Sequence, residues 1–277
     1  MPWLITLVVF WVYPLIYALV ISLTEYRTLT NEMTFIGLDN YAAVFADSGF
    51  WNALKNTLIF TIGTVPVTTS FALLLAVAIQ RRSKTVGSLF RAAYFLPSVT
   101  SLVVIALIFT NLYARDGYVN ALCAMMGIPY PEMGWLLTGS TALPAIMAMD
   151  VWISTGYYMI LFLAGMEAIP KDLYESAELQ GASRTQQFFR ITLPMLRPTL
   201  LFVVVINSIK SFQIFVEVYV MTRGGPLGAT TTLVYEVYHN AFEQTDMMGY
   251  ASALAYVVFV ILIIMSLIQV RLLKSEQ

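Results

Sequence analysis

The chain has 277 residues, of which 59% are hydrophobic and 11% are charged, and its formal net charge is −1. Soluble domains carry about 25% charged residues, so this chain has too few polar side chains to cover a water-facing surface and is suited to a lipid bilayer. The near-neutral charge excludes a basic footprint for nucleic acid. A single cysteine, Cys123, and a single histidine, His239, exclude an intrachain disulfide and most metal sites.

Apolar runs near 20 residues long are candidate transmembrane helices. Six such runs follow one another along the chain: Trp3–Leu23, Leu54–Ile79, Phe95–Tyr113, Leu143–Gly165, Leu200–Met221 and Ala251–Leu272. The first run lacks a basic start and is longer than the apolar core of a signal peptide, so we expect it to be retained as a span. The sequence therefore predicts an all-α, polytopic membrane protein with six transmembrane helices in a single domain over residues 1–277.

Lys and Arg gather in three segments of the chain. These are the loop after the second span, the polar stretch 167–198 and the C-terminal tail, and their basic residues are Arg81, Arg82, Lys84, Arg91, Lys171, Arg184, Arg190, Arg197, Arg271 and Lys274. The loops on the opposite side hold most of the acidic residues. Because cytoplasmic loops carry an excess of Lys and Arg, we expect the stretch 167–198 and both termini on the cytoplasmic side.

The fourth and fifth spans carry polar side chains, which are costly inside a membrane and mark functional hypotheses. In the fourth span, Asp150, Ser154 and Tyr157 fall on one helical face. The fifth span carries a larger set: Asn207, Lys210, Ser211, Gln213 and Glu217. In a straight helix Lys210 and Glu217 are too far apart for a direct ion pair. Neutral polar groups beside aromatic rings suit a hydroxylated solute, and a purely structural polar network is the alternative.

The stretch between these two spans, residues 167–198, reads EAIPKDLYESAELQGASRTQQFFRITLPMLRP and is one of the most polar parts of the chain. Pro170 suits the start of a helix, and Gly181 suits its end. Ser183 can cap a second helix. The pattern predicts two short amphipathic helices hinged at Gly181, and the small side chain of Ala177 permits close approach by a partner.

The loop after the fifth span carries a strong turn signal, Gly224-Gly225-Pro226. Tyr235, Tyr238 and Phe242 then recur at helical spacing, which predicts a short aromatic helix at the membrane interface. An aromatic belt that anchors the fold and a surface for a docking partner both fit this pattern.

The polar stretch resembles a known motif. Glu175-Ser176-Ala177, then Gly181, then Ile191-x-Leu193-Pro194 are similar in type and spacing to the EAA loop of ABC importer membrane subunits. The family's motif begins Glu-Ala-Ala, so Ser176 departs from it. FIGLDNY after the first span and the stretch 212–253 resemble the carbohydrate-importer branch, the MalF-like permeases. We name residues 167–198 the coupling segment.

This resemblance implies a permease subunit in a bacterial or archaeal cytoplasmic membrane, with a coupling helix seated on a cytoplasmic ATPase. It also implies a second, MalG-like permease as heterodimer partner, two ABC ATPase subunits and an extracytoplasmic solute-binding protein. The chain contains no GxxxxGK[ST] sequence. We therefore expect no cofactor on this chain, with ATP and Mg used by the partner ATPases.

Two other classes of function compete with this interpretation. A secondary transporter or channel could relay ions through Asp150, Lys210 and Glu217, but it would not need a hinged coupling segment. An intramembrane enzyme would need a histidine cluster, a GxSxG sequence or paired acids on a short motif, and the sequence has none of these. The solute stays open among mono- and disaccharides, trehalose-like glucosides, polyols and glycerol phosphate.

Overall fold

The computed structural model describes residues 1–27, 32–80 and 82–274. Arg81 and the Lys274 side chain, two of the basic groups counted above, lie outside this description. Within these described residues, five helices are long and apolar enough to cross a membrane, or six if one bent pair counts as a single span. The prediction of an all-α, polytopic membrane protein is confirmed.

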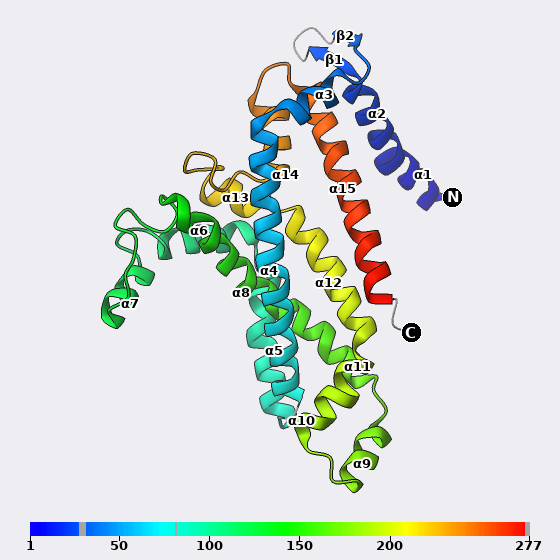
Figure 1. Ribbon diagram of the computed structural model, residues 1–277, viewed down its shortest axis with the longest axis vertical. Coiled ribbons are helices and arrows are strands. Elements are labelled where there is room, and N and C mark those ends of the chain that lie inside the picture. The colour runs from blue at the N-terminus through cyan, green and yellow to red at the C-terminus, as the bar shows by residue number, and fades with distance from the viewer. Residues whose placement is uncertain (28–31, 81, 275–277) are drawn as a thin grey trace.

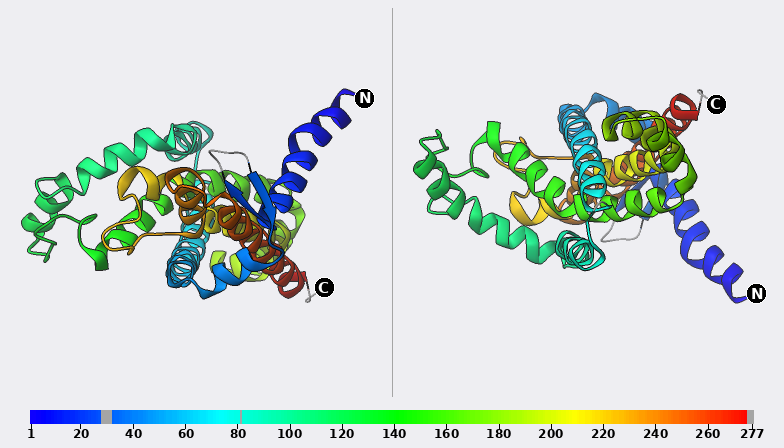
Figure 2. Two further views of the ribbon diagram at one scale, coloured as in Figure 1. Left: turned by 90° about the horizontal axis from the view of Figure 1, so that it is seen from above. Right: turned by 90° about the horizontal axis from the view of Figure 1, so that it is seen from below.

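The first spans follow the predicted runs closely. The first consists of α1 (Pro2–Leu7), the π-helical turn η1 (Val8–Val12) and α2 (Tyr13–Ser22). It leans away from the bundle and touches it mainly where α2 meets α15 (Figure 2). The second span is α4 (Ser48–Gln80), a single helix of 33 residues preceded by the short α3 (Asp39–Ala46). Only 6% of the first span is buried in this chain, so its apolar side chains suit lipid or a partner subunit.

The predicted third span, Phe95–Tyr113, is wrong as a single straight helix. The structure has α5 (Lys84–Val99) and α6 (Leu102–Leu112), bent by 94° at Thr100 and Ser101. Pro97 cannot donate a backbone hydrogen bond, and Ser98 Oγ donates instead to the carbonyl of Ile153 on α8 at 2.6 Å. After the bend, α6 and α7 (Tyr118–Met126) form an arm that extends sideways from the bundle (Figure 1).

The fourth span is α8 (Gly139–Glu167), and the sixth is α15 (Met248–Lys274). The fifth span is interrupted: α12 (Arg197–Phe212) ends before α13 (Val216–Met221) begins. Within the break, the carbonyl of Ile214 accepts a hydrogen bond from Thr232 Oγ1 at 3.1 Å. Irregular backbone at membrane depth requires such internal partners, so the break is a built feature of the span.

A small hairpin, absent from the all-α prediction, connects the first span to α3. Strands β1 (Thr24–Arg27) and β2 (Glu32–Phe35) pair antiparallel, with Thr24 opposite Phe35. Four-residue strands give too little alternation to be recognised in a sequence. The hairpin lies at the end of the molecule where α15 begins, and the free ends of α1 and α15 lie on the side toward the coupling segment (Figure 1).

Two helices at the centre of the bundle, α4 and α8, carry much of the buried core, including Phe60, Met149 and Phe162. The helix α8 also approaches α5 very closely: a Cβ on Gly156 would lie 1.8 Å from the carbonyl oxygen of Tyr94. Only glycine allows this backbone contact. It positions the bent pair α5–α6 against α8 and so creates the site described next.

Candidate functional site

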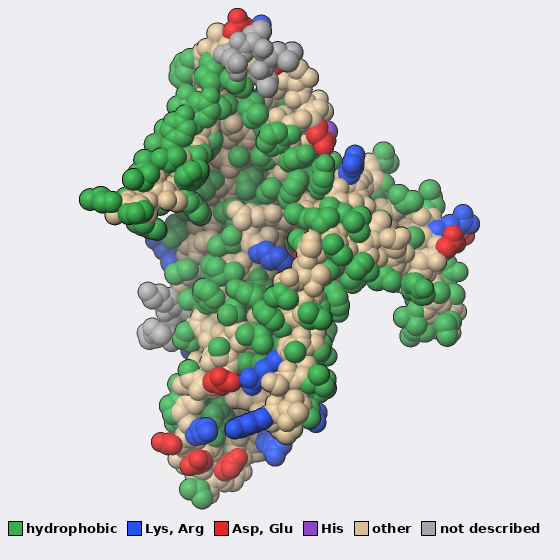
Figure 3. Space-filling model, turned by 180° about the vertical axis from the view of Figure 1, so that it is seen from behind, with side chains coloured by type: hydrophobic (Ala, Val, Ile, Leu, Met, Phe, Trp, Pro, Cys, Tyr) green, Lys and Arg blue, Asp and Glu red, His purple; other side chains and the backbone are tan. Residues whose placement is uncertain are grey.

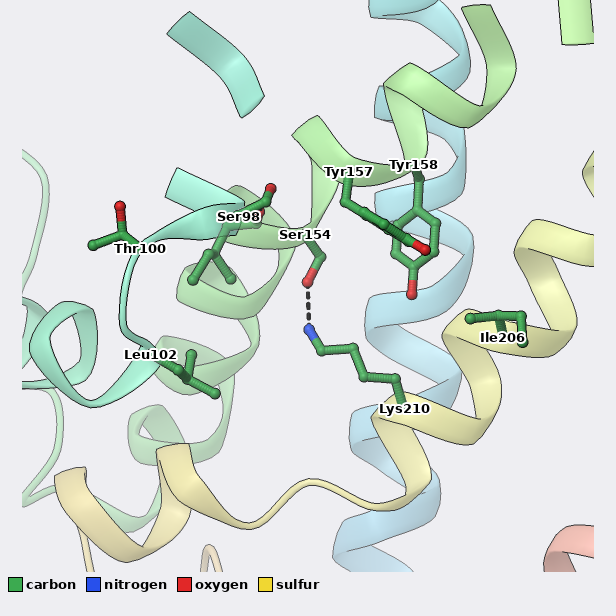
Figure 4. A pocket seen from close by; sticks show the side chains of 9 residues that line it. Ser98, Thr100, Leu102, Ser154, Tyr157, Tyr158, Ile206 and Lys210 are labelled. Carbon is green, nitrogen blue, oxygen red and sulfur yellow. Dashed lines mark hydrogen bonds between the residues drawn. The ribbon is translucent and has the colours of Figure 1, made fainter. Parts of the chain in front are cut away.

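A cavity of about 330 Å³ lies beside the α5–α6 bend, where α8 and α12 face it (Figure 4). We call it the bend cavity. It is lined by Ser98, Thr100, Leu102, Ile153, Ser154, Tyr157, Tyr158, Ile206 and Lys210. Five of these residues carry hydroxyl groups and one carries an ammonium group. The cavity therefore offers hydrogen bonds and aromatic surface together, which is what a polyhydroxylated ring requires.

Lys210 on α12 reaches across to α8. Its Nζ donates to Asp150 Oδ1 at 2.6 Å. It also donates to Ser154 Oγ at 2.5 Å (Figure 4). Ser154 Oγ in turn donates to Asp150 Oδ1 at 3.2 Å. The Lys210 side chain is 42% exposed and that of Asp150 is 2% exposed. The structure thus joins Asp150, Ser154 and Lys210 into one cluster, and Lys210 pairs with Asp150 on α8.

The other polar residues predicted for the fifth span lie away from the cavity. Asn207 is fully buried and accepts a hydrogen bond from Ser211 at 3.4 Å, while Ser211 meets Thr64 of α4 at 3.3 Å. Gln213 is exposed at the end of α12. Glu217 is buried in the first turn of α13, with Asp150 and Lys210 as electrostatic neighbours. Their proposed part in a solute pathway stays a prediction.

Sequence reasoning missed the contribution of the bend itself. Ser98, Thr100 and Leu102 line the cavity only because α5 and α6 turn at this point. The run Pro97-Ser-Val-Thr-Ser101 within an apolar stretch was the available signal, since proline followed by hydroxyl residues favours a broken helix. Tyr158 and Ile206 lacked any signal, because nothing in their local sequence separates them from neighbouring apolar positions.

The first half of the coupling segment is α9 (Lys171–Leu179), with Pro170 at its N-cap. Gly181 follows in the left-handed region at φ +72°. The N–H of Gly181 donates to the carbonyl of Glu178, and the N–H of Ala182 donates to that of Ala177, both at 2.9 Å. This pair of bonds is the Schellman arrangement that ends helices at glycine, so the predicted turn at Gly181 between two helices is present.

The second half begins with a capping box. Gln186 N donates to Ser183 Oγ at 3.3 Å, and Ser183 N donates to Gln186 Oε1 at 2.8 Å. Helical backbone then continues almost without interruption through α10 (Arg184–Gln187), the π-helical turn η2 (Phe188–Thr192) and α11 (Leu193–Met195) into α12. The predicted positions Ile191, Leu193 and Pro194 lie on this path. The second half of the coupling segment is therefore continuous, apart from a turn at Leu196, with the helix that carries Lys210.

The α9 helix contributes no buried residue to the fold. Glu175 and Ser176 are exposed, Ala177 is half-buried, and Leu179 is 91% exposed. The hydroxyl groups of Tyr174 and Thr192, 2.9 Å apart, tie α9 back to η2. Basic and acidic side chains gather at this end of the molecule (Figure 3). A charged, exposed helix that is held at one edge is an available docking surface.

The loop after α13 is tied to α4 at the opposite end of the bundle. Asn52 Nδ2 and Asn56 Nδ2 donate to the carbonyl of Gly228 at 2.8 and 2.9 Å. The aromatic helix predicted after the turn is confirmed as α14 (Leu233–Tyr238) and η3 (His239–Glu243). Tyr238 packs on Phe215 and Tyr219, with ring centroids 4.9 and 5.1 Å apart, so this helix helps anchor the fold.

Comparisons with known proteins cover nearly all of the chain. The family described as "binding-protein-dependent transport system inner membrane component" matches residues 68–275. The probable ABC transporter permease protein YurN of Bacillus subtilis is 37% identical over 92% of this chain and 88% of its own length. The lactose transport system permease protein LacF of Rhizobium radiobacter is 35% identical over 94% and 88%.

A third relative, the trehalose/maltose transport system permease protein MalF of Thermococcus litoralis, is 32% identical over 98% of this chain and 90% of its own length. Among solved structures, a chain of a bacterial alginate ABC transporter aligns with a TM-score of 0.84 at 24% identity. That alignment covers 97% of this chain and 90% of the other. The structural similarity establishes the fold, and the sequence similarity establishes the family.

Proposed function

The chain belongs to the family of binding-protein-dependent transport system inner membrane components, and we propose that it is a permease subunit of an ABC importer for a sugar or a related polyhydroxylated solute. The printed names of its relatives support this solute class, because they transport lactose, arabinooligosaccharides and trehalose or maltose. A further relative transports sn-glycerol-3-phosphate. The bend cavity, with its hydroxyl groups and tyrosine rings, suits such solutes chemically.

The observation that carries the coupling part of this proposal is the exposed α9 helix, which ends in a rigid Schellman turn and carries Glu175, Ser176 and Ala177. An amphipathic helix of this kind can lie in a groove of a partner protein. We propose that its partners are two cytoplasmic ATPase subunits, which use ATP and Mg that this chain does not bind. Gly181, Ile191, Leu193 and Pro194 would hold the segment in shape.

The orientation and the remaining partners are part of the same proposal. The protein spans a membrane several times, and we place the coupling segment and both termini in the cytoplasm of a bacterial or archaeal cell. A second, MalG-like permease would complete the pathway beside this chain. A solute-binding protein would dock at the opposite end, where the β1–β2 hairpin and the loop 224–232 lie.

Within the pathway, Ser154, Tyr157 and Lys210 are the strongest candidates for solute contact, because all three line the bend cavity. Asp150 would act through Lys210 by holding its ammonium group in place. Asn207 and Glu217 are weaker candidates, since both are buried between helices. Gln213 lies at the break between α12 and α13 and could meet a solute only near that point.

A crosslinking experiment tests the proposed coupling. In a Cys123→Ser background, Ala177→Cys should crosslink to the ATPase, and the yield should change between ATP-bound and ADP-bound complex. Ser48→Cys, exposed at the other end of the bundle, is the matched control and should give no ATPase crosslink. If Ala177→Cys fails to crosslink in every nucleotide state, α9 is not the docking helix. Purification of an active transporter without any ATPase would favour the ion-relay alternative.

A further inference from the structure

The wall of the bend cavity has a defined charge. Its lining residues, as far as the structure describes the chain, include one cation, Lys210, and no carboxylate. Asp150 lies behind the wall with 1% of its surface exposed, yet its Oδ1 is 2.6 Å from the Lys210 ammonium. A solute in the cavity can therefore contact the ammonium group of Lys210 directly, whereas the carboxylate of Asp150 that balances this charge lies behind Lys210.

The hydrogen bonds of Lys210 leave one donor for a ligand. An ammonium group has three N–H bonds, and two of them are directed at Asp150 Oδ1 and Ser154 Oγ. The side chain is 42% exposed, so the third N–H can reach a solute oxygen. The second oxygen of Asp150 has no hydrogen-bond partner among the described residues. Ser154 donates a neutral hydrogen bond to the first oxygen, so Lys210 is the cation that balances the charge of this buried carboxylate.

Glu217 does not make the cavity more positive. It is a buried carboxylate and an electrostatic neighbour of both Asp150 and Lys210, so it adds no positive charge. Asp150, Lys210 and Glu217 together thus carry no net positive charge. An anionic solute that drew Lys210 away would leave Asp150 buried and unpaired, which is strongly unfavourable.

We infer that the Asp150–Lys210 ion pair selects solutes by charge, so that the pathway takes an uncharged, hydroxyl-bearing solute and disfavours one carrying a carboxylate or phosphate. This inference rests on the proposed function only in assuming that the bend cavity is part of the solute pathway. Lys210 is the specificity-determining residue: it donates to a hydroxyl oxygen while its charge is cancelled by Asp150. Removal of the Asp150 charge alone should open the cavity to anions.

A thiol-labelling experiment measures the charge of the cavity without knowledge of the solute. Thr100→Cys places a thiol on the cavity wall in a Cys123→Ser background, in the assembled transporter. Labelling rates are measured by mass spectrometry of the labelled peptide, with an anionic sulfonatoethyl and a cationic trimethylammonioethyl methanethiosulfonate reagent. The ratio of the two rates reports local potential, because the intrinsic reactivity of the thiol cancels. A separate sample of the unsubstituted chain supplies the reference ratio at Cys123, which lies on α7 and does not line the cavity.

With the ion pair intact, the anion-to-cation ratio at Thr100→Cys should equal or fall below that at Cys123. Asp150→Asn should raise it about tenfold, as expected for one uncompensated charge near a partly desolvated site. The double variant Asp150→Asn with Lys210→Met should return it to the starting value. Ser154→Ala, which keeps both charges, is the matched control and should leave the ratio unchanged.

Three results would overturn the inference: a ratio already raised tenfold with the pair intact, no response to Asp150→Asn, or no labelling in any nucleotide state. The first and third results are measured in protein that retains Asp150, so they test the inference even if the Asp150→Asn variant fails to assemble. Failure of the proposed function would appear elsewhere, as loss of ATP-dependent uptake, and would leave this ratio unaffected.

Discussion

The coupling segment and the bend cavity both adjoin α8 and α12, but they are stabilised by different kinds of contact. Residues 168–170 connect α8 to α9, and the single residue Leu196 separates α11 from α12. The coupling segment keeps its shape through bonds between residues close in sequence, such as Ser183 with Gln186. The bend cavity depends on contacts between distant residues, such as Ser98 with Ile153 and Tyr94 with Gly156.

This difference indicates how each region works. A segment whose turns and caps are held by local bonds can stay folded while it moves with a partner. A cavity that is made by packing between helices changes shape whenever those helices shift. Motion of the coupling segment would therefore reach the cavity through α8 and α12, with the Asp150–Lys210 pair joining the two helices at the cavity wall.

The largest effect on stability is expected where α8 meets α5. Gly156→Ala places a Cβ 1.8 Å from the carbonyl oxygen of Tyr94, so the two helices must separate, at a cost of about 3 kcal/mol. Thermal unfolding of the purified complex measures this loss. Gly87→Ala is the matched control, because its Cβ would lie 3.7 Å from the nearest atom. Equal stability of the two variants would contradict the tertiary origin of the cavity.

The next largest effect is expected at the ion pair. Lys210→Met leaves Asp150 buried without its cationic partner and should destabilise the complex by about 3 kcal/mol. Asp150→Asn in the same chain should restore most of that loss, because the buried charge is then gone. Denaturant unfolding of both single variants and the double variant measures the coupling between the two residues. Additive effects would mean that the pair contributes nothing as a pair.

In the coupling segment we expect a substitution to reduce function strongly while it changes the stability of the whole complex little. Gly181→Val forces a β-branched residue to φ +72° and should cost about 1–2 kcal/mol, confined to the turn, because an added Cβ meets no atom within 4 Å. Membrane insertion and the unfolding temperature should stay near normal, while stimulated ATPase activity and uptake fall sharply. Gly181→Asn, which tolerates the left-handed region, should retain more activity. Normal uptake by the valine variant would count against the hinge.

The smallest effect is expected at the start of α10. Ser183→Ala removes one arm of the capping box and should cost about 1 kcal/mol, seen as faster hydrogen exchange at residues 184–187 with no change elsewhere. Ser83→Ala is the control, since Ser83 also precedes a helix, α5, but its side chain makes no capping bond. If both variants exchange alike, the capping box does not stabilise the segment.

The same contrast explains what the sequence could reveal. Pro170, Gly181 and Ser183 act on their immediate neighbours, so the two helices and the hinge of the coupling segment were predictable from local patterns. Five of the six spans were predictable from apolar length alone. The grouping of Asp150 with Ser154 was also predictable from helical spacing, because residues four positions apart lie on the same face of a helix.

The rest depended on packing between distant segments. Nothing local to Lys210 indicates that it reaches Asp150, 60 residues away. The 94° bend at Thr100 and Ser101 is fixed by α8 as much as by Pro97, and apolar length alone favoured one straight span there. Asn207 was grouped with the cavity residues because it shares their span, but its burial toward Ser211 is set by the position of α4.

Uptake by reconstituted proteoliposomes is the most direct test of the account. The complete transporter, with solute-binding protein outside and ATP inside, would be offered labelled lactose, maltose, trehalose and arabinooligosaccharides. The account predicts uptake of at least one of them that requires ATP and the binding protein and is lost in Gly181→Val. Uptake that needs neither ATP nor the binding protein, or that follows an ion gradient through this chain alone, would contradict it.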